Sequence, residues 1–175
     1  MSQHYHIRRA TAADSTLLAG IGAETFHDTF AADNAPANMA AYIAASFAPD
    51  KQAAELADPA TRFLIAEHDG TVVAYACLRF ASAPPAVTGR KPMEIVRIYV
   101  RKPWIGRGAG AQLMHVCLDE GRSEGCDTVW LGVWDRNTRA IAFYRKAGFA
   151  EVGAQAFQLG EERQRDLLMT RPIGR

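Results

Sequence analysis

Apolar and polar positions along the chain follow two different periods, which separate predicted helices from predicted strands. Between Ala12 and Phe30 apolar residues recur every three or four positions, and Leu17, Leu18, Ile21 and Thr25 share one face, which predicts a helix. An Asp-Gly step at residues 69 and 70 lies between two apolar runs and is typical of a β-hairpin. The other elements expected in this half are a short strand at residues 4–8, helical segments at 36–47 and 50–57, and hairpin strands at 62–67 and 72–80.

The second half of the chain alternates strand and helix patterns. A central strand is expected from Met93, and residues 128–134 form another run rich in β-branched and aromatic side chains. An amphipathic helix to about Glu124 separates the two, and a second helix begins near Asn137 and ends before Gly148. A final hairpin turns at residues 160–162. The expected order is β-αα-β-β-β-α-β-α-β-β, an α/β arrangement in one domain over residues 1–175.

Three glycines at alternate positions connect the central strand to the helix that follows. Gly106, Gly108 and Gly110 lack a Cβ, so a ligand can approach the backbone closely, and the first amides of a helix have no internal partners. This combination favours binding of a phosphate or pyrophosphate group. A P-loop is excluded because Ala111 and Gln112 stand where Lys and Ser/Thr are required, and the glycine spacing does not fit a dinucleotide fingerprint.

Composition restricts the classes of function further. The chain has 175 residues, 49% of them hydrophobic, and a formal net charge of +1, which gives no reason to expect nucleic acid as a partner. No apolar run approaches the length that spans a bilayer, and no signal-peptide core is evident, so we expect no membrane partner. Cys77, Cys117 and Cys126 are odd in number and unpaired in spacing, which favours reduced thiols in a cytoplasmic protein without a metal site.

The segment Asn-Thr-Arg-Ala-Ile-Ala-Phe-Tyr-Arg-Lys-Ala-Gly-Phe at residues 137–149 resembles the second signature of the GNAT superfamily of acetyl-CoA-dependent N-acetyltransferases. The resemblance covers residues 62–169. Residues 130–134, 157–160 and 166–169 are similar to the bacterial branch of spermidine/spermine N-acetyltransferases. The resemblance implies a mixed, mostly antiparallel central sheet flanked by helices.

The resemblance also implies acetyl-CoA as a co-substrate and direct attack by the acceptor amine, without a metal ion. The acetyl and pantetheine groups would pair with the central strand, and the pyrophosphate would lie on the glycine loop. Asn137 would bond the pantetheine arm, and Lys146 would contact phosphate or adenosine. The residues implied for this role are Ile98, Tyr99, Val100, Ile105, Gly106, Arg107, Gly108, Ala109, Gly110, Ala111, Asn137 and Lys146.

One position departs from the superfamily pattern. Ile105 stands where the pyrophosphate loop usually has Gln or Arg. The contact of that side chain is therefore missing or is replaced by Arg107 or Arg101. Most phosphate contacts in such a loop come from backbone amides, so the loop remains a candidate phosphate site.

Two residues are expected to carry the proton transfers. The resemblance makes Tyr144 the general acid that protonates sulfur, although its helical face, shared with Ile141 and Phe143, also fits a tyrosine of the core. Glu94 lies early in the central strand, where partial burial would raise its pKa toward that of a useful base. The alternative for Glu94 is an exposed strand start or an ion pair with Arg97.

Acidic residues of the first helix suggest how a cationic acceptor would bind. Glu24 and Asp28, with Asp33 nearby, are candidates for binding the amine, and Glu24, His27 and Asp28 are also rival bases. A solvated helix face is the alternative reading of the same charges. A polyamine is the favoured acceptor, and an amino acid, a peptide N-terminus or an aminoglycoside stays open.

Two other classes of function remain as alternatives. A noncatalytic acyl-CoA-binding sensor is consistent with Ile105 but would not need to keep Asn137 and Tyr144. A nucleotide-binding protein has both motif mismatches against it. The resemblance also makes a homodimer a candidate assembly.

Overall fold

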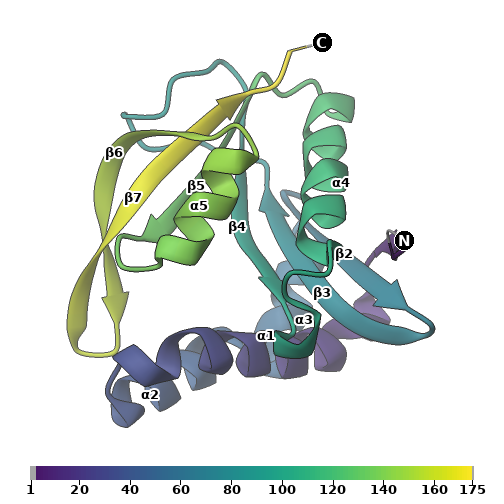
Figure 1. The fold of residues 1–175 in the computed structure, drawn as a ribbon, viewed down its shortest axis with the longest axis vertical. Coiled ribbons are helices and arrows are strands. Elements are labelled where there is room, and N and C mark those ends of the chain that lie inside the picture. Colours follow the sequence, from purple (N-terminus) through teal and green to yellow (C-terminus); the bar gives the residue numbers. More distant parts are fainter. Residues whose placement is uncertain (1–2, 175) are drawn as a thin grey trace.

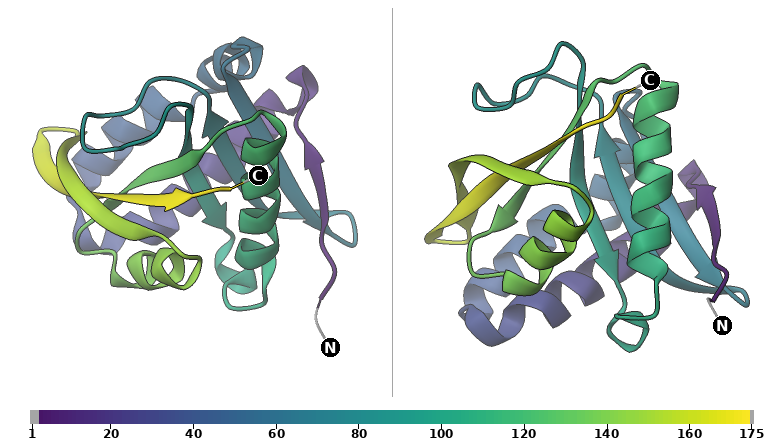
Figure 2. Two further views of the ribbon diagram at one scale, coloured as in Figure 1. Left: turned by 90° about the horizontal axis from the view of Figure 1, so that it is seen from above. Right: turned by 45° about the horizontal axis from the view of Figure 1, so that its top comes forward.

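The computed structural model describes residues 3–174 as one seven-stranded sheet with helices on both faces (Figures 1 and 2). The sheet order is β1-β2-β3-β4-β5-β7-β6, and only β4 and β5 are parallel neighbours. The elements are β1 (His6–Arg9), α1 (Ser15–Phe30), α2 (Pro36–Ser46), α3 (Pro49–Ala57), β2 (Thr61–His68), β3 (Thr71–Arg79), β4 (Pro92–Val100), α4 (Ala109–Ser123), β5 (Thr128–Trp134), α5 (Thr138–Lys146), β6 (Ala150–Leu159) and β7 (Glu162–Pro172).

Strands β4 and β5 pair over only three residues and then diverge. The parallel register begins at Pro92 with Thr128 and ends at Glu94 with Trp130. On its other edge β4 remains paired with β3, but the register shifts so that Val96 is an extra residue opposite Cys77 and Leu78. A bulge of this kind bends its strand, and here the bend carries β4 away from β5 and opens the sheet.

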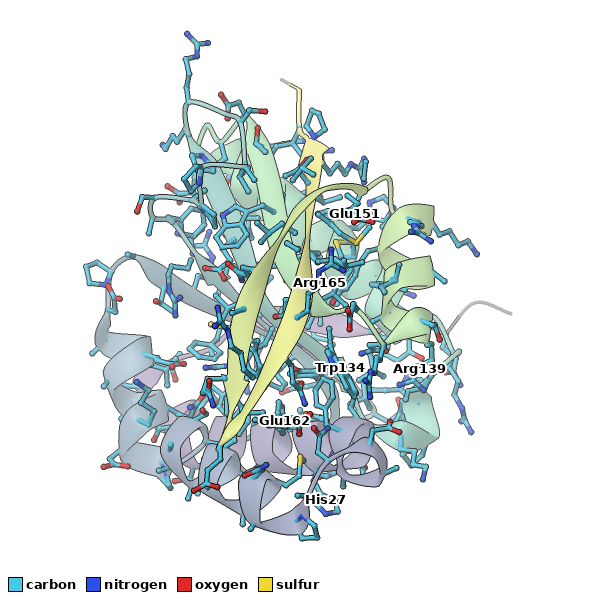
Figure 3. The ribbon with its side chains drawn as sticks, turned by 90° about the vertical axis from the view of Figure 1, so that its left-hand side faces the viewer. His27, Trp134, Arg139, Glu151, Glu162 and Arg165 are labelled. Atoms are coloured by element: carbon cyan, nitrogen blue, oxygen red, sulfur yellow. The ribbon has the colours of Figure 1, made fainter. Side chains whose placement is uncertain are left out.

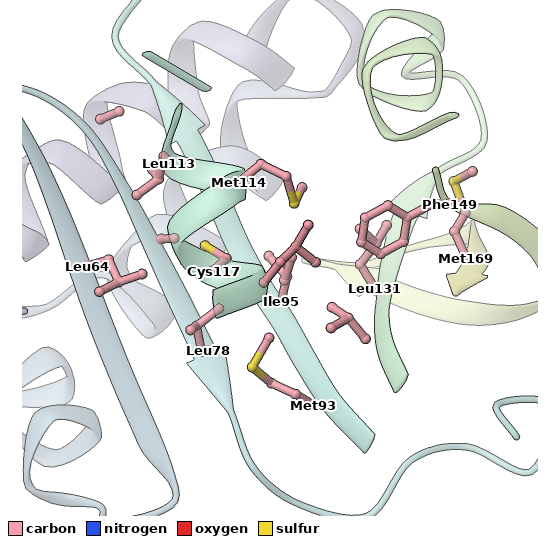
Figure 4. Packing of buried hydrophobic residues seen from close by; sticks show 14 of the residues in the cluster. Leu64, Leu78, Met93, Ile95, Leu113, Met114, Cys117, Leu131, Phe149 and Met169 are labelled. Carbon is pink, nitrogen blue, oxygen red and sulfur yellow. The ribbon is translucent and has the colours of Figure 1, made fainter. Parts of the chain in front are cut away.

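The two faces of the sheet carry separate hydrophobic clusters. Helix α4 packs Leu113, Met114 and Cys117 against β-strand residues that include Ile95 and Leu131 (Figure 4). The opposite face is covered by α1, α2 and α3. Its side chains form smaller clusters, with Leu18, Ile21, Phe63, Ile65, Tyr75 and Cys77 in one, Phe26, Met39, Phe47 and Leu159 in a second, and Val87, Trp130 and Leu168 in a third.

Local sequence signals explain where several elements begin and end. Asp69 and Gly70 both adopt positive φ, as the tight β2–β3 turn requires. Asn137 caps α5 by accepting a hydrogen bond from the Ala140 amide at 3.2 Å. Gly148 ends the same helix at φ 88°, a conformation that costs glycine little.

The expected fold is confirmed, with differences at the N-terminal helices. The helix predicted from Ala12 is a separate short 3₁₀ turn at Ala12–Asp14 before α1, because the Asp14 carboxylate accepts from the Thr11 amide at 2.8 Å and holds that turn. Leu17, expected on the inner face, is 37% exposed. The helical segment expected at residues 50–57 is α3, which makes three helices between β1 and β2 where the expected order β-αα-β-β-β-α-β-α-β-β has two. Within residues 3–174 no helix is long and apolar enough to cross a membrane.

A buried ion pair connects the bent strand to the helical layer. The Arg97 guanidinium donates to both carboxylate oxygens of Glu55 on α3, at 2.8 and 3.1 Å. Both side chains are about nine-tenths buried, and the guanidinium also lies 5.2 Å from the ring centroid of Phe47. The pair therefore fixes β4 beyond its bulge against α3 and the end of α2.

Glu55→Gln should destabilise the protein by about 3 kcal/mol, because it leaves the Arg97 charge buried without its counter-ion. Chemical denaturation of the two proteins measures the difference. Asp119→Asn is the matched control, since it removes an exposed ion pair with Arg122 and should cost about 0.5 kcal/mol or less. Equal effects of the two substitutions would contradict a structural role for the buried pair.

Candidate functional site

The divergence of β4 and β5 produces a cleft of about 530 Å³ between the two strands. This is within the usual size range of ligand pockets. Its walls come from β4, β5, β6, β7, the segment between β4 and α4, α5, and side chains of α1 and α2. Beyond Glu94 the edge of β4 that faces β5 has no strand partner, so its backbone groups are available to a ligand.

The glycine loop at one end of the cleft has the features of an anion site. Gly106 and Gly108 adopt φ of 79° and 93°, and nothing lies within 4 Å of where a Cβ would be. Helix α4 starts at Ala109, and its first intrahelical bond runs from the Gln112 amide to the Gly108 carbonyl. The amides at positions 109–111 therefore have no helical acceptor and lie at the positive end of a 15-residue helix.

The segment before β1 holds this loop in place. The Tyr5 hydroxyl donates to the Arg107 carbonyl at 3.0 Å, and the Tyr5 amide donates to the Gln112 side chain at 3.4 Å. The Tyr5 ring also packs edge-on to Trp104, with 6.2 Å between centroids. The loop conformation thus depends on residues about 100 positions away in the sequence.

Most of the predicted cofactor residues meet at the cleft. Those that line it are Ile98, Tyr99, Val100, Ile105, Gly106, Gly108, Gly110, Ala111 and Asn137. Three lie outside its wall: Ala109 is buried in the first turn of α4, Arg107 lies over the Trp104 ring at 5.4 Å, and Lys146 is exposed at the far end of α5.

The positions of Arg101 and Arg107 differ in how well either could replace the side-chain contact that is missing at Ile105. Ile105 lies at the cleft wall and is 38% exposed. Arg101 donates to the Val72 carbonyl at 2.8 Å and pairs with Glu24 at 3.2 Å. Arg101 is therefore committed to the contact between α1 and β3, and Arg107 is the nearer of the two arginines to the loop.

Tyr144 combines both readings that its sequence position allows. Its ring packs against Phe143 and Phe149 in the core, with centroids 5.4 and 6.0 Å away, and the residue also lines the cleft. Burial raises the pKa of the phenol well above its usual value, with a smaller contribution from Cys117. A phenol in this environment keeps its proton at neutral pH and can donate it.

Glu94 lies at the apex of the cleft, where β4 and β5 separate. Its carboxylate is 3.5 Å from Arg79, and the side chain is about 20% exposed. Arg97 is held by Glu55 and forms no ion pair with Glu94 within the described part of the chain. Burial raises the pKa of Glu94 above its ordinary value, while Arg79 and Arg97 act in the opposite direction.

The acidic residues of α1 lie apart from the cleft. Glu24 and Asp28 are exposed and line none of its wall, and His27 points away from the sheet at the lower edge of Figure 3. Their helix instead contributes Phe26, Thr29 and Phe30 to the wall.

Sequence reasoning missed Asp166, a carboxylate on β7 that lines the cleft and is only 8% exposed. It pairs with Trp134 on β5 and Gln155 on β6 in the sheet register. A Cβ on Gly132 would lie 3.3 Å from the Asp166 Oδ2 atom and 3.1 Å from Gln155 Nε2, so the missing side chain leaves the room that these two groups use. Burial, and then repulsion by Asp135, raises the pKa of Asp166 to about 6.

The signal for Asp166 was present in the sequence. It is a lone carboxylate directly before Leu167, Leu168 and Met169, in a run otherwise typical of a buried strand. Alternation along β7 places Leu167 and Met169 in the α4-side core and Asp166 on the opposite face. Its position in the cleft could be established only with the strand order.

Aromatic side chains cover the same face as Asp166. Phe26 of α1 stacks on Tyr42 of α2 and packs at a tilt against Phe30, which in turn contacts Trp134 of β5, with ring centroids 4.6–6.0 Å apart. Tyr42 continues the contact to Phe157 of β6 at 5.4 Å. Figure 3 labels Trp134 and, at the start of α5, Arg139, which also lines the cleft. We call the rings of Phe26, Phe30, Tyr42, Trp134 and Phe157 the aromatic wall.

Metal chemistry has no evident site in the described residues. Across residues 3–174, no three His, Cys, Asp or Glu side chains gather in a way that could hold a metal ion. Cys77, Cys117 and Cys126 are buried free thiols, and burial raises the pKa of each.

Comparison of structures supports the same type of fold. The PaiA N-acetyltransferase of Thermoplasma acidophilum, solved with coenzyme A, superimposes with a TM-score of 0.79 at 18% identity, covering 97% of this chain and 99% of that one. A GCN5-related N-acetyltransferase of Rhodopseudomonas palustris gives 0.78 at 20% identity, over 99% and 98% of the two chains.

Sequence comparison identifies the family. An uncharacterized N-acetyltransferase of Lactobacillus delbrueckii subsp. lactis is 36% identical over 87% of this chain and 88% of its own length, and one of Mycobacterium bovis is 34% identical over 91% and 98%. The model of the acetyltransferase (GNAT) family matches residues 24–149. The matched residues include the open edge of β4 and the glycine loop. The chain therefore belongs to the GNAT family of acetyltransferases.

Proposed function

We propose that this acetyl-CoA-dependent N-acetyltransferase is a cytoplasmic, single-domain enzyme that acetylates a primary amine of a small molecule. The observation that carries the proposal is the cleft itself, since a phenol, the buried carboxylate of Asp166, the half-buried carboxylate of Glu94 and an open strand edge meet there. A polyamine is the acceptor that the resemblance to the spermidine/spermine branch favours. Assembly as a homodimer is a proposal that rests on the resemblance alone.

The residues at the cleft fit the co-substrate. The amides at positions 109–111 and the loop at Gly106 and Gly108 would hold the pyrophosphate, and the open edge of Ile98–Val100 would pair with the pantetheine arm. Asn137 would bond that arm while it caps α5. Acetyl-CoA supplies the acetyl thioester. Ile105 adds no polar contact, so backbone amides supply most of the phosphate binding.

Tyr144 and Glu94 divide the proton transfers between the two faces of the sheet. The amine must lose a proton before its nitrogen attacks, and the sulfur gains one as the carbon–sulfur bond breaks. Tyr144, protonated at neutral pH, donates to sulfur from the α5 side. Glu94 accepts the amine proton from the opposite face, where burial makes it a better base than an exposed carboxylate.

The charges in the cleft support a cationic acceptor. Glu94 and Asp166 are its acidic lining residues. Of the two arginines on the wall, Arg97 is paired with Glu55, and Arg139 lies at the start of α5. Glu24 and Asp28 lie outside the wall and would act only at its approach. The sensor alternative has less support, because a binding module needs neither Tyr144 nor a buried base beside the open edge.

The test of the function is thiol release from acetyl-CoA with a panel of spermidine, spermine, amino acids, short peptides, aminoglycosides and simple arylalkylamines. We expect amine-dependent release with at least one of them and an N-acetylated product by mass spectrometry. Tight acetyl-CoA binding without release on any of these amines would favour the sensor instead.

Tyr144→Phe should lower kcat on the order of 100-fold and leave the affinity for acetyl-CoA within about twofold, because it removes a proton donor and keeps the ring packing. Steady-state rates and calorimetric titration measure the two quantities. Tyr75→Phe is the control, since Tyr75 is a fully buried phenol outside the cleft and its loss should leave turnover unchanged. A parallel loss of affinity in Tyr144→Phe would indicate a structural or binding role.

A further inference from the structure

The acceptor side of the cleft has a composition that restricts the amine it can take. Strand alternation places Glu94, Tyr99, Trp134 and Asp166 on the face that α1 and α2 cover, opposite Tyr144. The aromatic wall supplies the surface, and Thr29, Gln155 and Gln164 supply neutral polar groups. Two acidic side chains stand among them.

Only one of these carboxylates is free for a ligand. Glu94 faces Arg79 at 3.5 Å. Across residues 3–174, no hydrogen bond or ion pair joins the Asp166 carboxylate to another protein group, although the residue is more than nine-tenths buried. A buried carboxylate without a partner costs folding free energy, and a cationic ligand would supply the partner.

We propose that Asp166 binds the ammonium group of the acceptor, and that the aromatic wall selects a primary amine with a single positive charge and an apolar, preferably aromatic, body. This inference rests on the proposed acetyl transfer. Rings next to the ammonium group would stabilise the bound amine through their π faces. Rings next to its apolar body would stabilise it by burying apolar surface. A single free carboxylate matches a single charge, whereas a polyamine would leave further charges against apolar walls.

The position of Asp166 is compatible with the proton path through Glu94. The Asp166 carboxylate leans over Gly132, two residues along β5 from Trp130, which pairs with Glu94. Two residues of strand span about 7 Å, which leaves room for an ammonium nitrogen between the two side chains. An ammonium group has three N–H donors, so contact with Asp166 leaves donors for the side of Glu94.

Asp166 also gives the proposal a pH signature. Other charged groups near this face are Asp135, which pairs with Arg165 at 3.6 Å, Arg97, which is held by Glu55, and the lining residues Glu94 and Arg139. The folded-state pKa of Asp166, about 6, lies above its usual 3.8. Amine binding should therefore weaken as pH falls through about 6, when the carboxylate becomes neutral.

The same shift predicts the effect of Asp166 on stability. Between pH 3.8 and about 6 the folded protein binds more protons at Asp166 than the unfolded chain does. The free energy of unfolding therefore falls as pH rises through this range, and the loss is complete above about pH 6. Asp166→Asn should thus raise Tm at pH 7.5. A side chain kept only for structure would lower Tm when replaced.

The deciding experiment measures thiol release with phenethylamine, spermidine and phenylalanine as acceptors for the unchanged protein, Asp166→Asn and Asp135→Asn. We expect phenethylamine to have the highest kcat/KM. Asp166→Asn should raise its KM about 30-fold or more, with KM for acetyl-CoA changed less than about twofold. Asp135→Asn, the same chemical change outside the cleft wall, should leave KM for the amine near that of the unchanged protein.

The remaining outcomes test the amine site separately from the acetyltransferase activity. Turnover of spermidine or phenylalanine with phenethylamine inert overturns the acceptor class and keeps the acetyltransferase. An unchanged KM in Asp166→Asn overturns the role of the carboxylate. If the unchanged protein acetylates none of the three amines, the amine site is tested by calorimetric titration of phenethylamine into the CoA-loaded protein. Binding that Asp166→Asn abolishes supports the amine site, and absence of binding overturns it.

Discussion

The separation of β4 from β5 is the constraint on which the rest of the molecule depends. An extra residue at Val96 bends β4 while its other edge stays paired with β3, and the Arg97–Glu55 pair holds the bent part against α3. Because backbone groups on the free edge have no partner in the sheet, they are available to a ligand. The break in sheet pairing, which would weaken an ordinary sheet, is thus the feature on which the proposed coenzyme site depends.

The two faces of the opened sheet have different chemistry because strand side chains alternate. The unpaired first amides of α4 and the phenol of Tyr144 lie on the side of α4 and α5, and the aromatic wall and Asp166 lie under α1 and α2. In the proposed reaction the two reactants would therefore approach from opposite sides and meet in the gap.

Sequence patterns predicted the fold well because most of its elements are locally encoded. The Asp69-Gly70 turn, the cap at Asn137 and Gly148 at the end of α5 each fix an element within a few residues. The motif at residues 137–149 indicated the family, which the comparisons confirm. The predicted helix start at Ala12 was wrong because helical periodicity does not reveal where a carboxylate such as Asp14 turns the chain, and Leu17 is exposed rather than on the inner face.

The acceptor side was harder to predict because it is built from contacts distant in sequence. Phe26, Trp134 and Asp166 come from α1, β5 and β7, and no spacing rule relates them. The acidic residues on α1 were predicted to bind the amine because of their charge alone, yet Glu24 pairs with Arg101 and is exposed to solvent. Gly132 carries no chemistry of its own, and only the register shows that it makes room for Asp166.

Tyr5 has a practical consequence for handling the protein. Its hydroxyl and amide hydrogen-bond to Arg107 and Gln112, so the segment before β1 holds the glycine loop of the proposed coenzyme site in place. An affinity tag fused close to this segment, or a cut that removes it, would weaken these contacts. The geometry of the loop amides would change even though every residue of the family motif was intact.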